Sequence, residues 1–280
     1  MPDDVAPSNR AEAISNTWTW ILPAHAKALG FSVNTAGAHL ARSMMLNELT
    51  RLLQSTSSTA TTDQYRHAIV EENLLGKPTY SSRLNTFKHL SDLYSLDGSL
   101  TLFRLLRRFA TDEPASLPQL ALICSFCRDP QLRESFRLIE RLTSGEELPR
   151  QRMVDHLETL YPSRYSASMK TTLAQHVNTT WSKSGHLSGR TKKFRQMPTP
   201  TLTGTVYAML AGYLLGQRGT VLTGGLMSKL VGTNSLQAIS MLQAGGSRNW
   251  CRVRHGGDVL QIDFSLLLSP HEQELIHGET

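Results

Sequence analysis

The sequence predicts a mostly α-helical protein, a multi-helix bundle with helix-turn-helix elements and a C-terminal winged-helix-like β-hairpin. Three observations predict this class. Apolar residues recur at helical spacing along most of the chain, and strand-like alternation is scarce before residue 245. Residues 202–264 then read as three helices followed by two short alternating segments. With 280 residues, 40% of them hydrophobic, the chain can bury a substantial core.

Composition shifts divide the chain into four parts. We expect an N-terminal lead-in over residues 1–33 and an N-terminal helical domain over 34–145. A basic C-terminal domain follows over 146–268, and residues 269–280 form an acidic tail without a fixed structure. The polar segment Ser144-Gly145-Glu146-Glu147 is the expected linker between the two domains.

The first helix-turn-helix element is expected within residues 63–94. Asp63 can cap a helix that runs to Leu75, and Gly76-Lys77-Pro78 then breaks it. Thr79 can cap the second helix, which would place four hydrogen-bond donors near DNA: Ser81, Ser82, Arg83 and Lys88. A pair of packed helices is common in every all-α protein, so the same pattern also fits a purely structural role.

The charge of the chain is concentrated in one stretch. Residues 159–257 contain no Asp or Glu but carry twelve Lys and Arg, more than the net charge of +6 of the whole protein. Such a field attracts a polyanion. Because the segment also looks folded, we favour nucleic-acid binding over a basic surface that serves only solubility. Its densest part lies within residues 185–195, with cations at Arg190, Lys192, Lys193 and Arg195.

The end of the chain has the order of a winged helix. Helices are expected over residues 202–216, 220–231 and 235–242, and a β-hairpin over 250–264 turns at His255-Gly256-Gly257. In that order the third helix enters a DNA groove and the hairpin is the wing. The third helix would present Ser235 and Gln237, and the wing would present Arg248, Arg252 and Arg254.

The sequence lacks the motifs of an enzyme. Cys124 and Cys127 form a lone CxxC without a second ligand pair, so we expect buried structural thiols rather than a zinc site. No phosphate-binding loop, nucleophile elbow or acidic metal cluster is present. We therefore expect no catalytic activity, cofactor, metal or small-molecule substrate.

The expected location is the cytoplasm. The three cysteines are an odd number, which fits a reducing compartment, and the N-terminus lacks the basic region of a signal peptide. The apolar run over residues 202–215 is shorter than the ~20 residues that span a bilayer. It is expected to be a buried core helix, and no membrane contact is expected.

The order of these motifs resembles the BrxA family, a small component of BREX bacteriophage-resistance systems. The matching stretches are AGAHLAR at 36–42, AIVEENLLGK at 68–77, LFRLLRR at 102–108 and WSKSGHLSG at 181–189, followed by the C-terminal helices and hairpin. The resemblance implies a helical, non-enzymatic protein that binds double-stranded DNA and works with other proteins of the defence system. Two alternatives remain open at this point: a helical adaptor for acidic partner proteins, and an RNA-binding protein.

Overall fold

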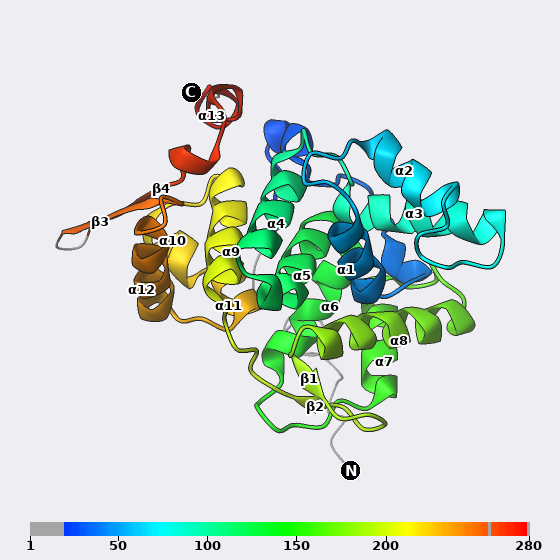
Figure 1. Cartoon of the computed structure of the whole chain (residues 1–280). Helices are drawn as coiled ribbons and strands as arrows, with labels where there is room; N and C mark the ends of the chain where they lie inside the picture. The colour runs from blue at the N-terminus through cyan, green and yellow to red at the C-terminus, as the bar shows by residue number, and fades with distance from the viewer. Residues whose placement is uncertain (1–19, 257–258, 279–280) are drawn as a thin grey trace, which may run out of the picture.

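The computed structural model describes residues 20–256 and 259–278. In this part of the chain thirteen α-helices and short 3-10 turns surround one core, with two antiparallel two-stranded sheets at the periphery (Figure 1). The mostly α-helical class is confirmed. Residues 1–19, 257–258 and 279–280 lie outside the described residues, and with them the start of the expected lead-in, part of the hairpin turn and the end of the expected tail.

The N-terminal half is built around α5, whose residues 119–127 are all buried. Pro118 lies in its first turn, where a missing N–H costs no hydrogen bond. The α-helices α3, α4, α6 and α9 pack around it. The elements are η2 (Ala24–Leu29), η3 (Ala38–Leu40), α1 (Leu46–Ser55), α2 (Thr62–Val70), α3 (Tyr80–Tyr94), α4 (Thr101–Asp112), η4 (Pro114–Ser116), α5 (Leu117–Arg128) and α6 (Pro130–Arg141).

The C-terminal half is centred on α9, which is buried at every position from Thr203 to its end. It is the core helix that the sequence predicts, and no described helix is both long and apolar enough to cross a membrane. The elements are α7 (Arg150–Leu160), α8 (Ala167–Lys183), β1 (Leu187–Ser188), β2 (Phe194–Arg195), α9 (Leu202–Leu214), α10 (Gly219–Gly224), α11 (Leu226–Val231), α12 (Ser235–Gly246), β3 (Arg252–Gly256), β4 (Val259–Asp263), η5 (Ser265–Leu267) and α13 (Pro270–His277).

The two halves share one core. The buried apolar residues of both form a single cluster, in which α9 packs against α4 and α5. The hydroxyl of Tyr207 on α9 donates to the carbonyl of Leu102 on α4 over 2.8 Å. Trp20 of the lead-in also joins this packing, edge-on to Phe126 at 5.7 Å and under the Arg133 guanidinium. The expected linker at residues 144–147 is therefore a loop within one packed unit.

Two helix boundaries differ from the sequence prediction. The helix expected to reach Leu75 is capped by Thr61 and ends at Val70, so residues 71–79, not three, separate it from α3. Asn73 adopts a left-handed φ of 53° and accepts a hydrogen bond from the Lys77 amide, which fixes an irregular turn. The helix expected over residues 220–231 breaks at Gly225, where the backbone is extended.

The acidic tail is not loose as expected. Ser269 caps α13 in a capping box with Glu272, whose carboxylate is buried and reaches Arg104 on α4 over 2.7 Å and the Thr101 hydroxyl. The sequence signal for this helix was the Ser-Pro-x-Glu start, which satisfies the first free amides. The end of the chain therefore packs on the N-terminal half.

This contact yields a stability prediction. The Glu272→Ala variant should lose about 2 kcal/mol of unfolding free energy, because Arg104 and Thr101 lose their acceptor. Urea denaturation followed by circular dichroism measures it. The Glu274→Ala variant, at an exposed position of the same helix, should stay within about 0.5 kcal/mol of the parent protein. Equal stability of both variants would contradict the assigned role of Glu272.

Candidate nucleic-acid interface

The residues that the sequence predicts to bind DNA fall into three separate regions. One is the start of α3, the second is the β1–β2 hairpin, and the third consists of α12 with the β3–β4 hairpin. Figure 1 shows α3 and α12 on opposite sides of the molecule and the β1–β2 hairpin at the bottom. The three regions therefore do not form one continuous surface, and each makes its own contacts.

The polar side chains at the start of α3 are largely engaged within the protein. Ser82 forms a capping box with Thr79, and Arg83 donates to the Val70 carbonyl over 2.6 Å. Lys88 lies 3.1 Å from the Asp92 carboxylate. Ser81 is exposed, but it is flanked by these internal contacts. The start of α3 is thus a poor candidate for reading DNA.

The helix α12 presents an exposed face without charge. Asn234 caps it by accepting from the Gln237 amide over 2.9 Å. The Ser235 hydroxyl is hydrogen-bonded to Thr223, so of the two predicted residues only the Gln237 side chain projects freely. The exposed face is made of small, amide, hydroxyl and apolar side chains: Leu236, Gln237, Ser240, Gln243 and Ala244.

Three exposed arginines lie next to this helix, at its end and on strand β3, which packs against it. The Arg248 guanidinium lies over the Trp250 ring at 5.1 Å from its centroid. Arg252 faces Asp263 across the hairpin at 3.7 Å with a side chain that is 60% exposed, and Arg254 is exposed opposite Gln261. The arginines therefore keep their charge in solvent.

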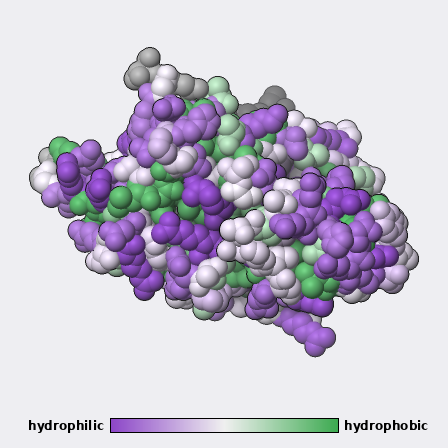
Figure 2. Space-filling model, turned by 45° about the horizontal axis from the view of Figure 1, so that its top comes forward, coloured by the Kyte–Doolittle hydropathy of each residue, from purple (hydrophilic) through white to green (hydrophobic). Residues whose placement is uncertain are grey.

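The same side of the molecule also exposes apolar side chains. Val221 on α10, Leu236 on α12 and Val259 on β4 are each more than half exposed. Figure 2 shows a hydrophobic band toward the side that carries the β3–β4 hairpin, within a surface that is otherwise mostly hydrophilic. Exposed apolar side chains on elements that pack beside the arginines are compatible with contact to the methyl groups of bases or to a protein partner.

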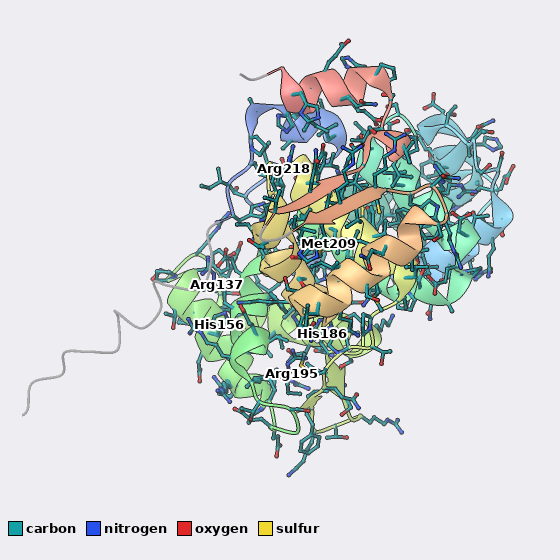
Figure 3. All side chains as sticks on the ribbon, turned by 90° about the vertical axis from the view of Figure 1, so that its left-hand side faces the viewer. Arg137, His156, His186, Arg195, Met209 and Arg218 are labelled. Atoms are coloured by element: carbon teal, nitrogen blue, oxygen red, sulfur yellow. The ribbon has the colours of Figure 1, made fainter. Side chains whose placement is uncertain are left out.

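In the β1–β2 hairpin, some residues of the predicted basic cluster are exposed and one is buried. Arg190 and Lys192 are exposed, and Lys193 donates to the Gly189 carbonyl over 2.7 Å. Arg195, in contrast, is buried, and its guanidinium donates to the carbonyls of His186 and Gln196 (Figure 3). Arg195 therefore stabilises the base of the hairpin and is not available to nucleic acid, contrary to the prediction.

The hairpin is held in place by backbone hydrogen bonds to the loop before α7. The Leu148 amide donates to the Lys193 carbonyl over 2.7 Å, and the Arg195 amide donates to the Glu146 carbonyl over 2.8 Å. Gly189 has a φ of 88°, and a Cβ there would lie 2.1 Å from the Lys192 carbonyl oxygen. Only glycine fits this turn, so the backbone that carries the cations of the loop has a defined path.

A buried polar network escaped sequence reasoning. His39 Nδ1 and the His39 amide both donate to Asp129 Oδ2 at 2.9 Å, and His39 Nε2 is hydrogen-bonded to Thr180 Oγ1 at 2.8 Å. Burial alone would raise the pKa of Asp129, but His39 and the Leu132 amide together lower it. The order Asp, His, hydroxyl is that of a catalytic triad. Here the Thr180 hydroxyl is fully buried and also accepts the Met44 amide, so the network is structural.

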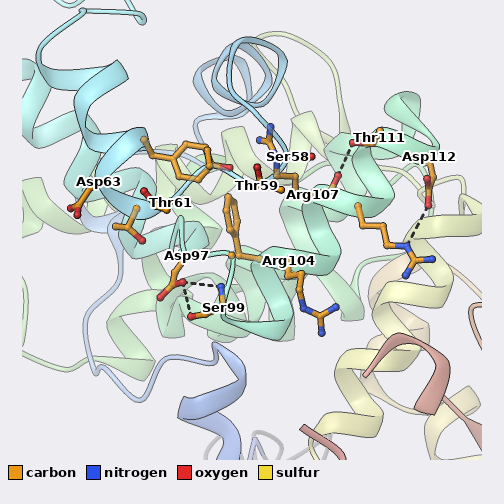
Figure 4. Close-up of a pocket in the computed structure, with 16 residues that line it drawn as sticks. Ser58, Thr59, Thr61, Asp63, Asp97, Ser99, Arg104, Arg107, Thr111 and Asp112 are labelled. Atoms are coloured by element: carbon orange, nitrogen blue, oxygen red, sulfur yellow. Dashed lines mark hydrogen bonds and ion pairs between the residues drawn. The ribbon is translucent and has the colours of Figure 1, made fainter. Parts of the chain in front are cut away.

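A cavity of about 770 Å³ lies between the loop after α1, the start of α2 and α4 (Figure 4). Its charged side chains serve the packing around it. Arg107 donates to the carbonyls of Leu53 and Thr56, and Arg104 is held by Glu272. Tyr65 also lines the cavity, and burial raises the pKa of its hydroxyl. These contacts fasten the α1–α2 loop onto α4, which is a structural role.

The two cysteines of the CxxC motif are buried thiols, as the sequence predicts. Cys124 and Cys127 are buried in α5, and burial raises the pKa of the Cys124 thiol to about 11. The described residues contain no group of three or more His, Cys, Asp or Glu side chains arranged for a metal ion. A scan of protein families and a search of curated proteins found no match to this chain.

Proposed function

We propose that this protein is a non-enzymatic, cytoplasmic protein that binds double-stranded DNA through α12 and the β3–β4 hairpin. The observation that carries the proposal is the pairing of an uncharged, exposed helix face with three exposed arginines beside it. We further propose, from the resemblance to the BrxA family, that DNA binding serves a phage-defence system that includes other proteins.

The helix face fits a DNA groove. An α-helix enters the major groove and contacts base edges with amide, hydroxyl and small apolar side chains. Gln237, Ser240 and Gln243 supply amides and a hydroxyl, and Ala244 supplies a methyl group on the same face. The order α9, α10, α11, α12, hairpin resembles that of a winged helix whose second helix is divided at Gly225, and α9 packs against both α11 and α12.

The arginines fit the phosphate backbone. Guanidinium groups bind phosphate oxygens in a bidentate manner, and they position a protein on the duplex without reading its sequence. Arg252 and Arg254 are two positions apart on β3, so their side chains lie on the same face of the hairpin. Arg248 at the end of α12 adds a third cation between helix and hairpin.

The test is a fluorescence anisotropy titration of a short DNA duplex at several salt concentrations. The Arg248→Ala/Arg252→Ala/Arg254→Ala triple variant should bind the duplex more weakly. Its slope of log affinity against log salt should be smaller by about 3, because each lost phosphate contact removes about one unit. The matched control is the Lys27→Ala/Arg42→Ala/Arg51→Ala variant, which removes the same charge from exposed positions of the N-terminal half.

The outcomes separate the competing functions. A control variant that behaves like the parent protein, together with a weakened arginine variant, supports the proposed surface. Equal weakening of both variants would mean that only net charge matters, and the surface would be wrong. Stronger binding of duplex RNA or single strands than of duplex DNA would replace the proposal with RNA binding. Absence of binding to every nucleic acid at low salt would leave the adaptor function.

A further inference from the structure

A second polar cavity, of about 480 Å³, lies away from the α12–hairpin surface, between the start of α7, one face of α8 and the β1–β2 loop. Its lining carries four cations, Arg150, Arg190, Lys192 and Lys193, and a single carboxylate, Glu147. The Glu147 carboxylate lies 3.6 Å from Lys192, so it offsets only part of this charge. A recess lined mostly by one sign of charge concentrates the opposite ion.

The start of α7 adds to the positive potential. Its N-cap residue is Pro149, which has no side-chain acceptor, and its first turn contains no acidic residue. The free amides of a helix N-terminus and the helix dipole both favour an anion. Pro149 and Arg150 line the cavity, so this end of the eleven-residue helix borders it.

An unsatisfied side chain lies in the wall of the same cavity. Asn178 on α8 is only 6% exposed, and its side-chain oxygen has no hydrogen-bond partner among the described residues. Buried polar groups are paired in the great majority of cases, because an unpaired one costs about 1–3 kcal/mol. The unpaired atom is an acceptor, so a hydroxyl or amine donor of a ligand in the cavity, such as those of a sugar or a base, can complete the hydrogen bonds of Asn178.

We propose that this cavity binds a phosphate monoester, the group carried by a free nucleotide or by a 5′-phosphorylated DNA end. A monoester carries about −1.5 to −2 charges at neutral pH, which suits the excess of cations better than the single charge of an internal phosphodiester. The volume lies within the ~300–1,000 Å³ range of small-ligand sites, so a sugar and base also have room. The Asn178 side-chain oxygen would accept from a sugar hydroxyl or a base amine, and Arg190, Lys192 and Lys193 would hold the phosphate.

The backbone of the cavity wall formed by the β1–β2 loop is held in place within the protein. The β1–β2 loop is held by the Gly189 turn and by the hydrogen bond between the Leu148 amide and the Lys193 carbonyl. Because the backbone that carries the cations is already ordered, binding costs only the entropy of ordering their side chains. The arginines of the β3–β4 hairpin differ from this cavity because they are exposed. In the function proposed above they bind DNA without an enclosing wall.

The experiment is a calorimetric titration of the full chain with deoxyadenosine 5′-monophosphate and, in parallel, with deoxyadenosine. Saturable binding of the nucleotide and none of the nucleoside is expected. The Asn178→Asp variant, which is nearly isosteric and adds a negative charge at the cavity wall, should weaken nucleotide binding by about ten-fold or more. The Asn85→Asp variant has the same net charge, with its change at an exposed position on α3, and should bind like the parent.

A second variant protects the test against a folding defect. Gln175 lines the cavity from an exposed position on α8, and the Gln175→Glu variant should also weaken nucleotide binding. Equal binding of nucleotide and nucleoside, no binding of the nucleotide at millimolar concentration, or unchanged affinity in both cavity variants would overturn the proposal.

Two DNA duplexes of the same sequence, one 5′-phosphorylated and one with 5′-hydroxyl ends, distinguish the sources of the phosphate. A preference for the phosphorylated duplex that Asn178→Asp removes would assign the cavity to DNA ends, and nucleotide binding without such a preference would assign it to free nucleotides. The binding of internal duplex by the β3–β4 arginines should be unchanged in Asn178→Asp. Each of the two proposals can therefore be tested even if the other one fails.

Discussion

Replacing Asp129 by alanine is expected to lower the unfolding free energy by about 3–5 kcal/mol, the usual cost of breaking a buried, hydrogen-bonded charge network. The carboxylate accepts from the His39 amide, the His39 ring and the Leu132 amide, at 2.9–3.0 Å. Removing it leaves these donors buried without an acceptor, and it also removes the cap of α6. Guanidinium denaturation followed by circular dichroism measures the loss.

The control for this prediction is an exposed aspartate. Asp155 is exposed on α7, where it accepts from the Gln151 amide nitrogen, and Asp155→Ala should change stability by no more than about 0.5 kcal/mol. If Asp129→Ala were as stable as Asp155→Ala, the buried network would not hold the segment around His39 to α6 and α8. If the Asp129→Ala variant were already unfolded near room temperature, its loss of stability would exceed the expected value. That outcome would still support the assigned role of Asp129.

The features that the sequence predicted correctly are local ones. The apolar spacing of α9 and the alternation of the hairpin strands each depend on neighbours a few residues away, and Thr79 caps α3 as expected. The burial of Cys124 and Cys127 followed from the apolar helix around them. Charge along the chain also located the exposed cations Arg190, Lys192, Arg252 and Arg254, which lie in the acid-free stretch over residues 159–257.

The features that it missed depend on contacts between distant residues. His39 and Asp129 are 90 positions apart, and neither position has a local signal for their contact. A Cβ on Gly37 would lie 2.1 Å from the Asp129 carboxylate, so this glycine is explained only by the folded structure. Arg195 looked like a member of an exposed cluster, but alternation along β2 turns it inward while Phe194 faces out.

The candidate cavity could be recognised only in the folded structure. Its Asn178 and Arg190 come from α8 and from the β1–β2 loop, and Arg150 comes from the start of α7. The sequence identified the loop cations but could not show that a buried amide faces the same recess. It likewise separated residues 34–145 from 146–268, whereas the contacts of α9 with α4 and α5 join them.

Lowering the pH from about 6.5 toward 3 is expected to destabilise the protein, and the loss of stability should begin at a pH above the pKa of ordinary carboxylates. His186 is fully buried, and burial together with Arg195 lowers the pKa of its imidazole from 6.5 to about 3. Burial also lowers the pKa of His156 (Figure 3), and of His89 and His176. The unfolded chain takes up protons near pH 6.5 that the folded chain cannot, so stability is complete above this pH and falls below it.

The size of this effect is dominated by His186. A pKa difference from 6.5 to about 3 corresponds to a loss on the order of 4 kcal/mol once the pH has fallen through the whole interval. Urea denaturation at pH values of about 7, 5.5 and 4.5 measures the slope. The His186→Asn variant should start less stable, because His186 Nε2 no longer reaches the Leu230 carbonyl at 2.9 Å, but its stability should depend less on pH.

The matched control is His271→Asn, at an exposed position in α13, which should keep the pH dependence of the parent protein. A parent protein with constant stability down to about pH 4.5 would contradict a neutral, buried His186. Because Arg195 lies beside His186 and donates to its carbonyl, protonation would place two cations together at the base of the β1–β2 hairpin. The hairpin should therefore loosen first on acidification, and amide hydrogen exchange of residues 186–196 should increase before that of α5.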